Sequence, residues 1–227
     1  MCMVAATVTK DFGVLASDSA MFDTSNSKMS FIKLKLYYTP LYLVSFIGTP
    51  VYFAQMDRSK FGADLPSLVV YMENYLKKIK PEVEKVLRSE IADEDENKPH
   101  FCLMILGIHK KLPTLVQFNS FLNFKPKYLY TDKAQPKFST IMYGDDNPQK
   151  KKMFLEATAY MEEKAKKFKD VDFSPGIAGE ILTRGIYRKA DIEMKLGPQK
   201  KYAGGIVNAG CIFKEGNMIS LSGVVPA

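Results

Sequence analysis

Four residues near the start of the chain, Cys2, Asp18, Lys33 and Lys35, are of the types that could together carry out acyl transfer. Once an initiator methionine is removed, a cysteine in the second position carries the free α-amino group of the chain. That amine, with a pKa of about 7.7–8.0, can take the thiol proton at neutral pH, so one residue supplies both nucleophile and base. A lysine cation nearby favours the thiolate over the thiol, and a carboxylate can hold that lysine in place.

A first predicted β-hairpin would bring the thiol and the carboxylate together. Residues 2–8 and 14–18 are apolar and β-prone, and residues 10–13 supply a turn between them. Asp18, at the end of the second strand, would then lie near the start of the first strand. A carboxylate buried at that position needs a cation beside it.

A second predicted hairpin supplies the candidate cations. Residues 31–38 and 41–46 predict two strands that turn at Thr39-Pro40, and the first of them carries Lys33 and Lys35. Both lysines would point to the same face of their strand, because side chains alternate with a period of two. We expect the two hairpins to follow one another in one sheet, with either lysine beside Asp18 and Lys35 preferred.

The rest of the chain alternates between predicted helices and predicted strands. Apolar periodicity and capping residues predict helices over 50–59, 65–87, 148–168 and from 175 onward. The second of these is expected to begin at a cap formed by Asp64, with Pro66 in its first turn. Further strands are expected over 101–108 and 112–119, which turn at Lys110-Lys111, and over 138–143, 204–213 and 218–221. The helix over 148–168 is expected to bury Phe154, Leu155, Ala159 and Met161. This order fits an α+β fold, a four-layer α-β-β-α sandwich of two antiparallel sheets, in a single domain over 1–227.

Composition excludes several classes of function. The chain has 227 residues, 46% of them apolar, and contains no apolar run of the roughly 20 residues that span a bilayer, so no membrane contact and a cytoplasmic location are expected. The net charge is +7, but the lysines are mixed with acids and no nucleic-acid motif accompanies them, so they predict solvated helix faces. No phosphate-binding glycine loop is present, and we expect no cofactor.

The cysteines and histidines predict neither a disulfide framework nor a metal centre. The three cysteines lie far apart in the sequence, and Cys102 and Cys211 stand inside apolar segments typical of the core. The two histidines, His100 and His109, have no cysteine or carboxylate at ligand spacing, so no zinc site is expected.

The order of features at the N-terminus resembles the N-terminal nucleophile hydrolases of the proteasome β-subunit type, which include the bacterial HslV-type peptidases. Their pattern is a terminal nucleophile, an acid sixteen positions later after Ala-Ser or Ala-Thr, a lysine that opens an aliphatic strand, and an apolar strand that ends in glycine. Here Cys2 precedes Ala16-Ser17-Asp18 by that spacing, and Gly48 closes residues 43–47. Lys35 fits if the hairpin turn is one residue short, and Lys33 fits if the turn is one residue long.

The resemblance implies both an activity and an assembly. Cys2 would attack an amide of a peptide or protein substrate, and the backbone N–H of Gly48 would stabilise the oxyanion. The acyl group would then pass to water, as in a peptidase, or to an amine, as in a transpeptidase. The family self-assembles, so a homo-oligomer is expected, with a ring as one form. Ala20 and Lys200 depart from the family pattern, which implies a different handling of protons.

Two other readings remain open. Met1-Cys2 also opens the choloylglycine hydrolase and penicillin acylase group, whose members hydrolyse amides of small molecules. Alternatively, the chain keeps the sandwich as a non-catalytic scaffold subunit, with Asp18 in a structural ion pair.

Overall fold

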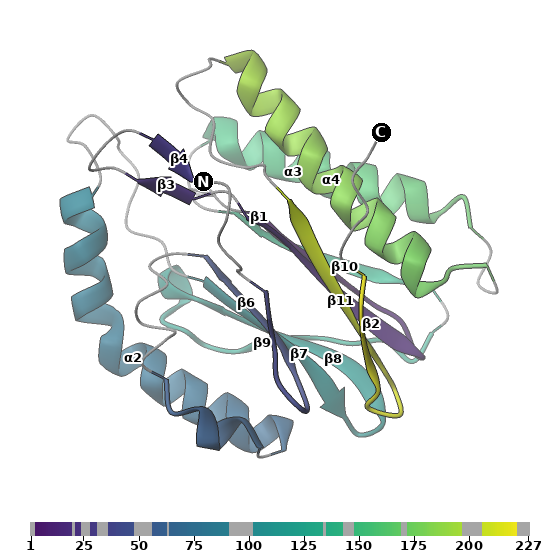
Figure 1. Ribbon diagram of the computed structural model, residues 1–227, viewed down its shortest axis with the longest axis horizontal. Helices are drawn as coiled ribbons and strands as arrows, with labels where there is room; N and C mark the ends of the chain where they lie inside the picture. The colour runs from purple at the N-terminus through teal and green to yellow at the C-terminus, as the bar shows by residue number, and fades with distance from the viewer. Residues whose placement is uncertain are drawn as a thin grey trace.

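The computed structural model describes residues 3–19, 21–23, 28–30, 36–47, 56–62, 64–90, 102–133, 135–142, 148–168, 172–196 and 206–221. Within these ranges the fold is α+β, with two five-stranded antiparallel sheets and three α-helices (Figure 1). The α-helices are α2 (Leu65–Glu90), α3 (Pro148–Ala165) and α4 (Pro175–Leu196). The two short 3₁₀ helices are η1 (Arg58–Gly62) and η2 (Ser120–Leu122). None of the described helices has both the length and the apolar character needed to cross a bilayer.

Each sheet collects strands from distant parts of the chain. The first sheet has the order β10 (Lys137–Met142), β1 (Met3–Val8), β2 (Phe12–Asp18), β11 (Val207–Phe213) and β12 (Met218–Ser220). The second sheet has the order β5 (Leu36–Tyr38), β6 (Leu43–Ile47), β7 (Cys102–His109), β8 (Leu112–Asn119) and β9 (Lys127–Leu129). A separate pair is formed by β3 (Met21–Asp23) and β4 (Lys28–Ser30).

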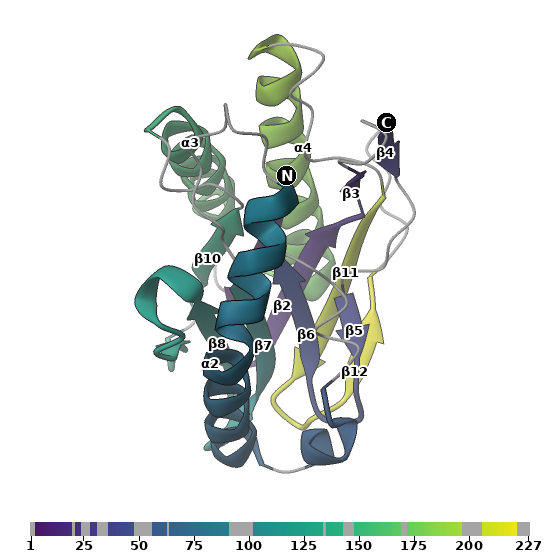
Figure 2. The ribbon, with the colours of Figure 1, turned by 90° about the vertical axis from the view of Figure 1, so that its left-hand side faces the viewer.

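Three apolar clusters define the layers. One cluster lies between the two sheets and joins side chains such as Val4 and Leu15 of the first sheet to Leu43 and Met104 of the second. A second cluster packs α2 on the outer face of the second sheet, and a third packs α3 and α4 on the outer face of the first. Figure 2, in which α2 faces the viewer, shows the strands of the second sheet behind that helix. Both faces of both sheets are therefore covered.

A phenol joins the two sheets along one edge. The hydroxyl of Tyr38, at the end of β5, donates a hydrogen bond to the carbonyl oxygen of Ala209 in β11 over 2.9 Å. The next residue of β11 is Gly210, where an added Cβ would lie 2.8 Å from that hydroxyl oxygen. The close approach of the ring therefore requires a glycine at this position.

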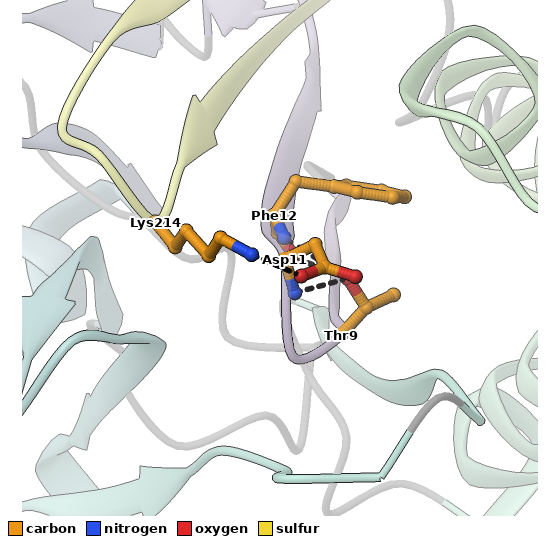
Figure 3. A network of polar contacts seen from close by, with 4 residues as sticks. All are labelled: Thr9, Asp11, Phe12 and Lys214. Carbon is orange, nitrogen blue, oxygen red and sulfur yellow. Dashed lines mark hydrogen bonds and ion pairs between the residues drawn. The ribbon is translucent and has the colours of Figure 1, made fainter.

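The turn between β1 and β2 is fixed by local hydrogen bonds and by the β11–β12 turn (Figure 3). The hydroxyl of Thr9 accepts hydrogen bonds from the amides of Asp11 and Phe12. The Asp11 carboxylate pairs with the ammonium group of Lys214 over 2.7 Å, and the amide of Lys214 donates to the carbonyl of Asp11.

Most expected elements are present, and α2 follows its capping signals closely. The Asp64 side chain accepts a hydrogen bond from the amide of Ser67 over 2.9 Å, and Pro66 lies in the first turn. The helix continues through Pro81 to Glu90, as the spacing of its apolar residues indicates. The predicted hairpin turn at Lys110 and Lys111 is also formed, with positive φ angles of 51° and 63°.

Two expectations are wrong, and a third falls mostly outside the described residues. The hairpin of β5 and β6 belongs to the second sheet, so the first two hairpins do not lie in one sheet. In α3, Leu155 is 56% exposed and Ala159 is also exposed, whereas Met161 is buried as expected. Arg58–Gly62 forms a 3₁₀ helix, while most of the helix expected over 50–59 lies outside the described residues.

The side chain of Phe154 and the acidic stretch over 92–97 also lie outside the described residues.

The wrong expectation for the buried face of α3 has a simple cause. The buried residues of α3 are Ala157, Met161 and Ala165, spaced four apart, and this buried stripe does not include Leu155 or Ala159.

Candidate functional site

Asp18 occupies the end of the first hairpin that the sequence predicts. Met3, at the start of β1, lies opposite Asp18 at the end of β2, because Val4 pairs with Ser17 in an antiparallel register. The amide nitrogen of Met3 donates a hydrogen bond to Oδ1 of Asp18 over 3.3 Å. This nitrogen belongs to the peptide bond between Cys2 and Met3, so the carboxylate contacts the amide that follows the candidate nucleophile.

The Asp18 side chain is completely buried, with 0% of its surface exposed. On its other side it is paired with Val207 of β11. Met3 and Val207 both belong to the cluster packed against α3 and α4, and residues directly opposite one another in a sheet share a face. The row Met3, Asp18 and Val207 therefore faces the helices α3 and α4 rather than the second sheet.

Two polar side chains hold the main chain around this row. The hydroxyl of Ser19 accepts a hydrogen bond from the amide of Ile206 over 2.9 Å. The Tyr187 side chain, on α4, hydrogen-bonds to the main chain of Val207, and its pKa is raised because burial disfavours the phenolate. These contacts connect β2, β11 and α4 at the level of Asp18.

The open ends of the two predicted hairpins lie at the same end of the sandwich. Gly13, near the turn of the first hairpin, lies over Leu106. A Cβ atom added at Gly13 would be only 2.7 Å from Cδ1 of Leu106. Leu106 pairs with Leu43, which is next to the turn of the second hairpin. The turns therefore coincide, and the open ends with Asp18 and Ile47 lie at the opposite end of the molecule.

The other predicted site residues, Cys2, Lys33, Lys35 and Gly48, lie outside the described residues. Their neighbours in the chain can be placed. Met3, Leu36 and Ile47 stand at the open ends of the two hairpins, and each is fully or almost fully buried. The topology thus brings the bonded neighbours of Cys2, Lys35 and Gly48 to one end of the sandwich, and Asp18 is the predicted site residue whose contacts are seen.

Sequence reasoning missed Lys189, whose side chain is completely buried in α4. Among the described side chains, Asp18 and Lys189 are the two charged groups that are buried. The signal was available, because Lys189 follows Leu182 by two helical turns and therefore continues the apolar stripe of the helix.

A hollow of about 590 Å³ lies at the other end of the molecule, around the hairpin turns. Its walls include Leu41, His109, Lys110 and Gly216, together with the start of α2. It is therefore separate from Asp18. In the ranges that the structure describes, no group of three or more His, Cys, Asp or Glu side chains is placed to hold a metal ion.

Comparison of the sequence with protein-family models and with curated proteins finds no match. The residues themselves therefore carry the argument about function.

Proposed function

We propose that the chain is an N-terminal nucleophile hydrolase of the proteasome β-subunit type, with the four-layer fold of that group. Cys2 becomes the nucleophile once Met1 is removed. The substrate is an amide bond of a peptide or protein, and the chain works without a cofactor as a homo-oligomer.

The observation that carries this proposal is the buried carboxylate of Asp18, bonded to the amide of Met3 over 3.3 Å. Burial of a carboxylate at a strand end is unfavourable without a polar partner, so its presence beside the N-terminal segment needs an explanation. An acid that organises a terminal nucleophile supplies one. The common end of the two hairpins gives further support, because Lys35 and Gly48 are bonded to residues at that end.

The proposed chemistry has two steps. The α-amino group of Cys2 takes the thiol proton, and the sulfur attacks the carbonyl carbon of the substrate amide. The backbone N–H of Gly48 stabilises the oxyanion, and Lys35, or Lys33 in its place, favours the thiolate. The amine leaves with the proton as a thioester forms between substrate and Cys2. Water or a second amine then attacks the thioester and releases the thiol.

The test combines intact mass with labelling by iodoacetamide at pH 7.5. The expected protein lacks Met1 and is labelled at Cys2, and Cys2→Ala abolishes both the label and any peptide hydrolysis or ligation. Asp132→Asn, at an exposed aspartate distant in sequence, is the control and should label at the wild-type rate. A native protein that keeps Met1, or a Cys2 that reacts no faster than a free cysteine, contradicts the proposal and favours the scaffold.

A further inference from the structure

We propose that one side of the sandwich is a subunit interface, and that it receives the acidic segment over 93–96 of a neighbouring copy of the chain. The surface consists of the exposed side chains over 122–137, from the end of η2 through the edge strand β9 to the first residue of β10. We call this surface the basic edge. The inference rests on the homo-oligomer of the proposed function and names the surface that assembles it.

Large side chains are exposed in the first part of the basic edge. Leu122 is 60% exposed, Tyr128 is 45% exposed and Tyr130 is 54% exposed. Single exposed apolar side chains are normal, whereas several on one surface mark an interaction site. Tyrosine is also enriched in the cores of protein interfaces. These three side chains are therefore the candidates for the centre of the interface.

The same surface carries positive charge that is not balanced within the described residues. The stretch over 122–137 contains four lysines, Lys125, Lys127, Lys133 and Lys137, and one acid, Asp132, which gives a net charge of +3. All four lysines are exposed. None of them forms an ion pair in the part of the chain that the structure describes. The basic edge is therefore suited to a negatively charged partner.

The basic edge extends across the rims of both sheets. Tyr128 is paired with Val116, which packs under α2, so Tyr128 lies on the α2 side of β9. Lys127 is paired with Gln117 and lies on the other side of β9. The hydroxyl of Ser139 in β10 contacts the side-chain oxygen of Gln117 over 3.2 Å, which joins the second sheet to the edge of the first.

The backbone that carries these side chains is held in place. The amide of Phe124 donates a hydrogen bond to the carbonyl of Asn119 over 2.9 Å, and the Phe124 ring is buried in the cluster under α2. The ammonium group of Lys80 on α2 donates to Oδ1 of Asn123 over 3.4 Å. The ammonium group of Lys137 donates to the carbonyl of Tyr130 over 3.0 Å. A surface that is already ordered loses little conformational entropy on association.

The chain itself contains a segment of complementary charge. Four consecutive acids occupy positions 93–96, between α2 and β7, and this segment lies outside the described residues. Opposite charges on two surfaces steer their association and fix its register. The two surfaces come from different parts of the chain, so each copy would use one surface on each neighbour. Such head-to-tail contacts close into rings when the rotation between subunits permits.

The interface is tested by charge reversal, with assembly measured by sedimentation velocity of the full chain. Lys125→Glu combined with Lys127→Glu should raise the dissociation constant at least about tenfold, and so should Asp93→Lys combined with Glu94→Lys. Lys166→Glu combined with Lys167→Glu, at two exposed lysines after α3, is the matched control and should assemble as the unmodified chain does. Equal weakening by the control, or no weakening by either test variant, overturns the interface.

Mixing the two test variants decides whether the contact joins different copies. In an equal mixture, each reversed basic edge meets a reversed acidic segment on the other variant, so assembly should return to at least the dimer. If the mixture stays monomeric while one chain with all four substitutions recovers its assembly, the acidic segment binds its own chain and the proposal is wrong. Circular dichroism of each variant checks that it remains folded.

The apolar centre and the other possible occupants have their own outcomes. Leu122→Ser combined with Tyr130→Ser should weaken assembly at both about 50 mM and about 500 mM NaCl, whereas the charge-reversed variants should differ from the unmodified chain mainly at the lower salt concentration. An unmodified chain that is monomeric at low salt overturns the proposal. If that monomer binds an oligomer of deoxythymidine and loses it on Lys125→Glu with Lys127→Glu, the surface binds single-stranded nucleic acid instead.

Failure of this interface and failure of the proposed chemistry give different results. A monomer that loses Met1 and is labelled at Cys2 removes the interface and leaves the nucleophile in place. A chain with an unreactive Cys2 that assembles and responds to charge reversal as expected keeps the interface and removes the chemistry.

Discussion

The amide nitrogen of Met3 lies 3.3 Å from Oδ1 of Asp18, and this hydrogen bond ties the first strand to the end of the second. Asp18→Ala should lower the free energy of unfolding by about 1–3 kcal/mol, because a buried amide loses this acceptor. Urea unfolding monitored by circular dichroism measures the loss. Asp132→Ala, at an exposed aspartate, should change it by no more than about 0.5 kcal/mol. Equal effects of the two variants would show that the bond contributes nothing.

The contact between Gly13 and Leu106 sets how the first hairpin lies on the second sheet. Gly13→Ala should destabilise the protein by about 1–3 kcal/mol, since the new Cβ would lie 2.7 Å from a leucine methyl group. Gly176→Ala is the matched control, because the nearest atom there is 3.9 Å away and alanine favours a helix by about 0.5–1 kcal/mol. The midpoint of thermal unfolding should fall in Gly13→Ala and rise in Gly176→Ala. A Gly13→Ala variant with a raised midpoint would contradict the hairpin placement.

The hydroxyl of Ser45 is buried and has no hydrogen-bond partner among the described residues. Ser45→Ala should therefore leave stability unchanged or raise it by about 1 kcal/mol, because the folded state no longer buries an unsatisfied hydroxyl. Ser17→Ala is the comparison, since the Ser17 hydroxyl donates to the carbonyl of Asp18 over 3.2 Å. That variant should lose about 1 kcal/mol. A clear loss in Ser45→Ala would indicate a partner in the part of the chain outside the description.

The two described cysteines should be inert in the folded protein. Burial raises the pKa of the Cys211 thiol to about 12, and Cys102 is completely buried between the sheets. With a pKa of about 12 instead of about 8.5, the thiolate population at pH 7.5 is roughly a thousandfold lower. Peptide mapping after iodoacetamide treatment should find these thiols modified only after denaturation. Modification of Cys211 in the native state would contradict its placement.

The pair of Lys214 and Asp11 should make stability depend on pH in the alkaline range (Figure 3). The hydrogen bond to Asp11 and its charge raise the pKa of Lys214 above the ordinary 10.5. The ion pair therefore contributes fully to the free energy of unfolding below that ordinary pKa. This stabilisation is lost as the pH rises through the higher pKa of Lys214 in the folded state. The stability difference between the protein and Lys214→Met should shrink above about pH 10.5 and also in high salt, since the pair is exposed. A difference that stays constant through this range would contradict the pairing.

Local chemistry in the sequence predicts the individual elements well. Asp64 and Pro66 predict the start of α2, and Lys110-Lys111 predicts a tight turn, because caps and turns depend on a few adjacent residues. Strand β9 and the pair of β3 and β4 were not predicted, since strands of three residues carry almost no periodicity. The burial of Cys102 and Cys211 was predicted correctly from the apolar segments around them.

Placement of elements in space was harder to predict than their existence. The first two hairpins were expected in one sheet, but β1 and β2 lie in one sheet and β5 and β6 lie in the other. The order of strands along the chain is compatible with either arrangement. The position of Asp18 beside the first strand was nevertheless correct, because it depends only on the register within one hairpin. Lys189 was missed because a lysine in a helix is normally solvated, and only its spacing from Leu182 marks it as buried.

The hydrogen bond from Tyr38 to Ala209 has a consequence for the mobility of the whole molecule. One phenol bridges the edge strand of the second sheet and an inner strand of the first, so shear between the sheets would break it. Together with the apolar cluster between the sheets, this bond opposes sliding of one sheet over the other.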